Sequence, residues 1–185
     1  MYRSWEQVAG YFGGDGSVDF DPGKWVLHPR ITFTDNYRPL LEMLKLFLAA
    51  RGIRTWKTSF LRGAWRFGVA QADSLVQLGT MMGSQCSKKK IEVKAMVDYL
   101  ESTITGTEFV QALNESVKSG NRTGKIRVVD IPYTREQGQT LSKKEHAEHT
   151  KRMGEANQIL TDDELEEIRL SIISGEATNR DLAKK

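Results

Sequence analysis

The sequence is poor in cysteine, with Cys86 alone among 185 residues. One cysteine cannot form a disulfide within the chain or build a cysteine-based zinc site, and it fits a reducing compartment. Long apolar runs are also lacking, because residues 40–50 are interrupted by Glu42 and Lys45 and are too few to span a bilayer. The first residues lack the apolar stretch of a signal peptide. We therefore expect an intracellular protein without a membrane partner.

Charge is distributed unevenly along the chain. The net charge is +3, but residues 160–185 hold seven acids and four bases. Residues 1–159 therefore hold 23 bases and 17 acids, a net charge of +6. A moderately basic region fits a polyanionic partner, although a merely solvated surface explains the charge equally well. Hydrophobic residues, at 39%, are sufficient for a buried core.

A run of small residues near the N-terminus, residues 8–16, carries the strongest functional signal. It reads Val-Ala-Gly-Tyr-Phe-Gly-Gly-Asp-Gly. Glycine inside a helix costs about 1 kcal/mol relative to alanine, so its glycines predict that another backbone comes very close. If that backbone is the same helix of a second copy, two Asp15 carboxylates lie side by side, and a divalent cation relieves their repulsion. An acid at a helix C-terminus opposes the helix dipole, which favours a functional role for Asp15.

This run resembles the signature of the LAGLIDADG homing endonucleases. The matching or apolar positions are Val8, Ala9, Gly10, Tyr11, Phe12, Asp15 and Gly16, whereas Gly13 replaces an acid that varies in the family. The resemblance implies Mg²⁺ as cofactor, with Mn²⁺ or Ca²⁺ able to substitute for binding, and Asp15 and the Gly14 carbonyl as its ligands. The run occurs once in the sequence, so the resemblance also implies a homodimer. Its interface would contain Ala9, Gly10, Gly13 and Gly14.

Two other metal patterns are rejected. Residues 15–21 have the alternate spacing of a calcium loop, but Phe20 stands where that loop requires glycine and Val26 where it requires an acid. His146 and His149 are three residues apart but have no companion ligand in the sequence, so we interpret them as linker residues.

Hydrophobic periodicity predicts an α+β fold in the order α-ββ-α-ββ-α, followed by further helices. The expected helices are residues 5–16, 37–51, 72–82, 88–102 and 107–118, and the expected strands are residues 17–21, 25–34, 54–61 and 64–70. This order resembles the homing-endonuclease core, which implies an antiparallel saddle sheet over DNA. Residues 1–118 form this predicted core. Residues 119–159 are expected to be a basic polar linker, extended apart from a short strand at 126–131, and residues 160–185 a helical tail that resembles a truncated helix-turn-helix.

One face of the predicted sheet is polar and suited to reading base edges in the major groove. Phosphate contacts are as good an interpretation for any single residue. The candidate DNA-binding residues are Asp19, Asp21, Lys24, His28, Arg30, Thr32, Arg38, Arg54, Lys57, Ser59 and Arg66. For Arg38, a packing or surface role is an equal alternative. The aromatics Trp25, Trp56, Trp65 and Phe67 are expected in the helix-covered core.

Three consecutive lysines open the fourth predicted helix. Resemblance implies that a lysine in this region approaches the scissile phosphate, with Lys88 the first choice and Lys90 the second. A solvated basic patch is the alternative interpretation.

The leading hypothesis is a metal-dependent homing endonuclease that hydrolyses double-stranded DNA at a long pseudo-palindromic site, with Asp15, Lys88 and Lys90 as catalytic residues. Two alternatives use the same scaffold. One is a non-catalytic DNA-binding transcription regulator, which would generally lack the metal-binding acid, and the other is an intron maturase that binds structured RNA.

Overall fold

The structure is a computed structural model that describes residue 2, residues 4–83, 85–86, 88–120 and 125–157, and residues 166 and 169–170. It contains two compact units, Met1–Ser142 and Lys143–Lys185, and the first holds the sheet and its covering helices. No helix among these residues is long and apolar enough to cross a membrane. The predicted truncated helix-turn-helix at 160–185 lies almost entirely outside the described residues.

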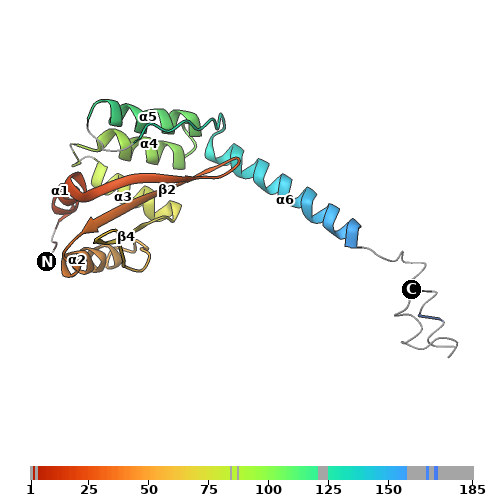
Figure 1. Cartoon of the computed structure of the whole chain (residues 1–185), viewed down its shortest axis with the longest axis horizontal. Coiled ribbons are helices and arrows are strands. Elements are labelled where there is room, and N and C mark those ends of the chain that lie inside the picture. Colours follow the sequence, from red (N-terminus) through yellow and green to blue (C-terminus); the bar gives the residue numbers. More distant parts are fainter. Residues whose placement is uncertain are drawn as a thin grey trace. The chain divides into compact units, whose positions relative to one another are not determined.

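The observed order of elements confirms the α-ββ-α-ββ-α prediction, followed by further helices (Figure 1). The helices are α1 (Trp5–Asp15), α2 (Arg38–Ala49), α3 (Ala72–Gly83), α4 (Lys90–Leu100), α5 (Gly106–Lys118) and α6 (Arg135–Asn157). The strands are β1 (Gly16–Pro22), β2 (Leu27–Asp35), β3 (Ser59–Leu61) and β4 (Ala64–Val69). They form one antiparallel sheet in the order β1-β2-β4-β3, so β1 and β3 are its edges.

The β3–β4 hairpin is set by its two-residue turn. Arg62 has φ 54° and Gly63 has φ 85°, the left-handed conformations that a two-residue hairpin turn requires. β3 is only three residues long, whereas the alternation of the sequence predicted a strand from residue 54. Residues 54–58 instead approach β4 through a bond from the Trp56 amide to the Gly68 carbonyl, 3.0 Å long.

The two faces of the sheet have different environments. Side chains on one face, such as Val18, Ile31 and Phe67, are fully buried beneath helices α1 to α4. The alternate positions of the same strands carry polar side chains that are partly or fully exposed. A sheet with one buried and one solvated face is the arrangement that the alternation predicted.

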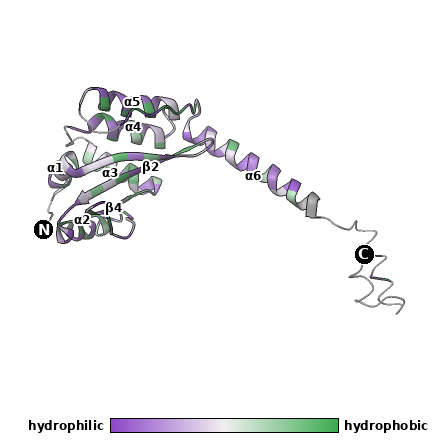
Figure 2. Cartoon of the chain, viewed as in Figure 1, coloured by the Kyte–Doolittle hydropathy of each residue, from purple (hydrophilic) through white to green (hydrophobic). Residues whose placement is uncertain are grey.

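Residues 125–157 differ from the predicted extended linker. No strand forms at 126–131; instead Ile131 is buried against α5, and the Gly106 amide bonds the Tyr133 carbonyl at 2.9 Å. α6 begins after Thr134, whose amide and hydroxyl bond the side chain and amide of Gln137 in a capping box. Figure 2 shows α6 as mostly hydrophilic, so no apolar stripe marked it as a helix.

Candidate active site and nucleic-acid interface

The helix α1 has a buried face and an open face. Val8, Ala9 and Phe12 are buried in the core, which turns the glycines toward solvent. A Cβ atom built on any of Gly10, Gly13 or Gly14 would meet no atom within 4 Å. These three glycines, named here the glycine face, are therefore not required by packing within the chain. Ala9, which was also predicted at the interface, differs from them, because it is only 2% exposed and lies in the core of its own chain.

The end of α1 presents Asp15 to solvent. No described cation pairs with its carboxylate, which lies at the negative end of the helix dipole. The chain then enters β1 through Gly16, where a Cβ atom would lie 2.0 Å from the Phe12 ring. A side chain larger than hydrogen cannot fit there without displacing Phe12, so this glycine of the motif is fixed by a close approach inside the chain.

A buried lysine closes this end of α1. Lys89 is 8% exposed, and its ammonium donates to the Phe12 carbonyl at 3.0 Å and to the Gly16 carbonyl. The cation thus binds main-chain oxygens on both sides of Asp15, and the Phe12 carbonyl also accepts from the Gly16 amide at the end of the helix. A cation is favoured at this end by the helix dipole. Lys88 and Lys90, the predicted lysines, are exposed on either side of it. The sequence therefore pointed to the two lysines beside the buried one. The position of each lysine relative to the buried face of α4 is what distinguishes Lys89 from them.

A second acid, Asp35, lies at the end of β2 and is held by hydrogen bonds. The Tyr11 hydroxyl donates to Asp35 Oδ2 at 3.0 Å and to the Thr34 carbonyl at 2.8 Å, and the Tyr37 amide donates to Asp35 Oδ1 at 2.7 Å. Burial raises the pKa of Tyr11, and the Asp35 carboxylate and the more distant Asp15 raise it further. Both carboxylates therefore act on the same tyrosine, and Asp35 is a residue of this site that sequence reasoning missed.

The polar face of the sheet brings together most of the predicted DNA-binding residues. In the strand register Asp19 lies opposite Arg30, Asp21 opposite His28, and Arg66 opposite both Thr34 and Ser59. A hollow of about 390 Å³ on this face is lined by Asp21, His28, Pro29, Arg30, Thr32, Trp56, Arg66 and Ala70.

Trp56 lies on this polar face of the sheet and not on the helix-covered face where it was expected. A Cβ atom on Gly68 would lie 2.4 Å from the Trp56 ring and 2.0 Å from the Ile31 carbonyl. Because Phe67 and Val69 point into the core, Gly68 points to the polar face, and the indole ring covers it there. The expectation that Trp56 faces the helix-covered side is therefore wrong.

The charges at the β1 edge are paired within the chain. Arg30 lies 2.5 Å from Asp21 and 3.6 Å from Asp19, and Arg127 lies 2.7 Å from Asp19. The predicted acids therefore hold two guanidinium groups in place. Arg127, in the segment expected to be a linker, is a second residue that sequence reasoning missed.

One family model matches part of the chain. Residues 6–64, which span α1 apart from its first residue and also β1, β2, α2 and β3, match the model of the LAGLIDADG-like domain. This match covers less than half of the chain. Lys89 and Arg127 lie beyond the matched stretch. A search of curated proteins finds no match.

The chain also has similarity to solved structures. An archaeal intron-encoded homing endonuclease, I-Vdi141I, solved with DNA, is 18% identical, with a TM-score of 0.48 over 75% of this chain and 96% of that one. The homing endonuclease I-CvuI, solved with a DNA target and Mg, is 17% identical, with a TM-score of 0.49 over 76% and 92%. A third, I-TnaI, is 13% identical, with a TM-score of 0.48 over 78% and 99%.

The remaining predicted contacts lie outside the polar face of the strands. Lys24 lies in the β1–β2 loop over the Trp25 ring, and Arg38 at the start of α2 stacks on Trp65 at 4.7 Å and pairs with Glu42. Arg38 packs on Trp65 but its side chain is 54% exposed, so a contact with phosphate stays a prediction. Two exposed candidates, Arg54 and Lys57, precede β3, where Arg54 bonds Gln71 at 3.5 Å. Among the described residues, no group of three histidine, cysteine or acidic side chains converges as a metal site.

Proposed function

We propose that this chain is one subunit of a homodimeric, divalent-metal-dependent endonuclease that cuts double-stranded DNA at a long pseudo-palindromic site. The observation that carries the proposal is the glycine face of α1, open along the helix and ending at the exposed Asp15. Two copies packed along this face would bring two Asp15 carboxylates together and align two polar sheet faces along one duplex. Such cutting would serve the homing of an intron or intein.

Of the two acids near the end of α1, Asp15 is better suited to bind a metal. Asp35 already accepts hydrogen bonds from the Tyr11 hydroxyl and the Tyr37 amide, whereas no described donor satisfies Asp15. A Mg²⁺ ion held by the Asp15 carboxylate and the Gly14 carbonyl would neutralise charge that develops on a phosphate during hydrolysis. Hard oxygen ligands of this kind are the set that Mg²⁺ prefers.

Lys89 keeps the metal-binding end of α1 in place. Its ammonium bridges the Phe12 and Gly16 carbonyls, so the backbone before and after Asp15 is tied to α4. Lys88 and Lys90 are exposed on the same turn and are free to approach a phosphate. We therefore assign Lys89 a positioning role and keep Lys88, then Lys90, as the candidates for phosphate contact.

The polar face of the sheet would read the DNA. An antiparallel pair of strands fits the major groove, and arginine pairs with guanine through two hydrogen bonds. Arg66 and His28 are exposed and form no ion pair with another described residue, whereas Arg30, which is 33% exposed, must first release Asp19 and Asp21. Exposed pairs contribute only about 0–1 kcal/mol, so this exchange is inexpensive.

The proposal can be tested on the purified full chain without knowing its natural target. Duplexes are enriched by repeated binding in Ca²⁺ and then incubated with Mg²⁺, with EDTA in a parallel sample. We expect cleavage in Mg²⁺ and none in EDTA. Asp15→Asn should bind the selected duplexes and leave them uncut, whereas Glu115→Gln, which removes an exposed acid on α5, should cut normally.

Each other outcome points to a different conclusion. Cleavage by the Asp15→Asn variant would show that this acid is not in the active site. Binding without cleavage in Mg²⁺ or Mn²⁺ would indicate a non-catalytic DNA-binding regulator. Stronger competition by structured RNA than by duplex DNA would indicate a maturase.

A further inference from the structure

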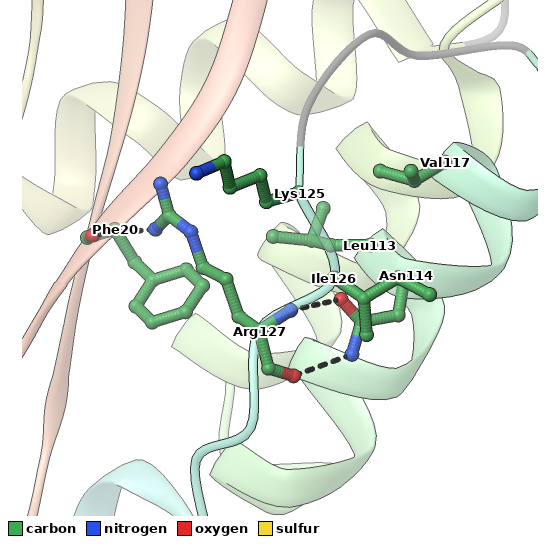
Figure 3. A pocket seen from close by; sticks show the side chains of 7 residues that line it. All are labelled: Phe20, Leu113, Asn114, Val117, Lys125, Ile126 and Arg127. Carbon is green, nitrogen blue, oxygen red and sulfur yellow. Dashed lines mark hydrogen bonds between the residues drawn. The ribbon is translucent and has the colours of Figure 1, made fainter.

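Residues 125–131, named here the strap, are fixed along the edge of the first unit. The Asn114 side chain binds both polar atoms of one strap residue: it accepts from the Arg127 amide at 2.9 Å and donates to the Arg127 carbonyl at 2.7 Å (Figure 3). At the far end the Thr107 hydroxyl accepts from the Ile131 amide at 2.9 Å. An amide side chain that satisfies both backbone groups holds this segment much as a neighbouring strand would.

The Arg127 side chain is aimed from the strap at the edge strand β1. Its guanidinium lies 4.7 Å from the centre of the Phe20 ring, donates to the Phe20 carbonyl at 3.2 Å and pairs with Asp19 at 2.7 Å. The side chain remains 41% exposed. Arginine carries five N–H donors in a fixed plane, so these contacts leave donors for a ligand approaching from solvent.

A second cation from the strap lies in the same region. Lys125 and Arg127 line one hollow of about 470 Å³ together with Phe20 and residues of α5, and both side chains extend toward β1 in Figure 3. Phe20, Leu113 and Val117 also line it, so the hollow lies between the edge strand β1 and α5. Two cations beside one hollow at the edge of the sheet, next to its polar face, fit an anionic group on an extended ligand.

We propose that Arg127, assisted by Lys125, binds a backbone phosphate of double-stranded DNA beside the bases read by the sheet. This inference rests on the proposed function. A phosphate is favoured over a base because Arg127 lies outside the edge strand and part of its guanidinium is already engaged. Phosphate contacts of this kind position a protein on the duplex and carry no sequence information themselves.

The salt dependence of DNA binding tests this proposal. Each neutralised phosphate contributes about 0.9 to the slope of log K against log salt concentration. We expect Arg127→Ala to reduce that slope by about 0.9, so its affinity deficit should shrink about 3.5-fold between 50 and 200 mM salt. Lys45→Ala, which removes a cation from α2 on the helical side of the sheet, should leave the slope unchanged.

Two further variants separate a phosphate contact from a structural role. Arg127→Lys keeps a charge at this position and should retain most of the slope, although it loses the planar fork. Asn114→Ala removes the clamp but no charge, and should weaken binding by releasing the strap. Far-ultraviolet circular dichroism checks that each variant folds.

The outcomes distinguish this inference from the proposed function. If the unaltered chain binds no duplex DNA, the proposed function fails and this inference fails with it. If the unaltered chain binds and Arg127→Ala gives the same slope as Lys45→Ala, only the assignment of Arg127 fails. The same conclusion follows if Arg127→Lys loses as much slope as Arg127→Ala, because a phosphate contact depends on charge.

Discussion

Replacing Gly10 and Gly13 together by alanine should act in opposite directions on the folding and on the association of this chain. Neither new Cβ atom meets an atom of the same chain within 4 Å. Alanine in place of glycine stabilises a helix interior by about 0.5–1 kcal/mol. For an isolated subunit the double variant should therefore gain about 1.5 kcal/mol, which corresponds to roughly 4 °C in melting temperature for a chain of this size.

The same two methyl groups should weaken a dimer that packs along the glycine face. Forcing extra methyl groups into a close contact typically costs about 1–3 kcal/mol, and each subunit contributes its own pair. The dimer should lose at least about 2 kcal/mol, which raises its dissociation constant roughly 30-fold. Sedimentation equilibrium measures this dissociation constant. Urea unfolding at protein concentrations well below the dissociation constant measures the stability of the isolated subunit.

A matched variant isolates the position of the change. Gly83→Ala at the end of α3 adds the same methyl group in ordinary contact with Val93, at 3.5 Å, and should leave association unchanged. Our reasoning is refuted if the double variant of α1 associates as tightly as the original chain. The reasoning is also refuted if the isolated subunit of the double variant is less stable than that of the original chain. The new methyl groups would then meet atoms of the same chain, and the glycine face would not be open.

Three further predictions concern the interior of the first unit. Lys89→Met removes the donor to two main-chain carbonyls, so the free energy of unfolding measured in urea should fall by about 1–3 kcal/mol, whereas Lys90→Met should change it little. Gly68→Ala places a methyl group against the Ile31 carbonyl and the Trp56 ring, so thermal melting should show a loss of about 1–3 kcal/mol, and an unchanged melting temperature would mean that the indole does not cover this strand. Burial, followed by Asp35, raises the pKa of Tyr11 above its ordinary value of 10.0. Tyr11 therefore ionises at lower pH in the unfolded chain than in the folded chain. The free energy of unfolding should keep its full value below about pH 10 and fall as the pH rises above it. Tyr11→Phe should flatten this alkaline decline in urea unfolding measured at a series of pH values.

The sequence was sufficient to predict the sheet and the helices that cover it, for local reasons. Apolar positions recur every second residue in β2 and at helical spacing in α2. Arg62-Gly63 is a two-residue turn that joins the strands on either side of it into a hairpin. The prediction failed where that signal was weak. The long helix α6 has no apolar stripe, and its capping box at Thr134 and Gln137 was a signal that could have found it.

The missed site residues depend on contacts between distant parts of the chain. Lys89 bonds a carbonyl 77 residues away in sequence, and Arg127 bonds one 107 residues away. Asp35 is joined to Tyr11 across 24 residues. Periodicity and spacing describe neighbours within one element, so they could identify the lysine run but not which lysine turns inward.

Helix α1 combines three roles on different faces, which makes them separable by mutation. Its buried face fixes the sheet through Phe12, its open face carries the glycines, and its last residue is Asp15. A change on the buried face alters stability whether or not a second copy is present. A change on the open face acts on the isolated subunit only through helix propensity and otherwise acts on association. Asp15→Asn removes an acid that opposes the helix dipole, so it should lower neither the stability of the subunit nor its association. If Asp15→Asn abolishes cleavage without lowering stability or association, while the glycine variants lower association and cleavage together, the dimer places the acid and the acid performs the chemistry.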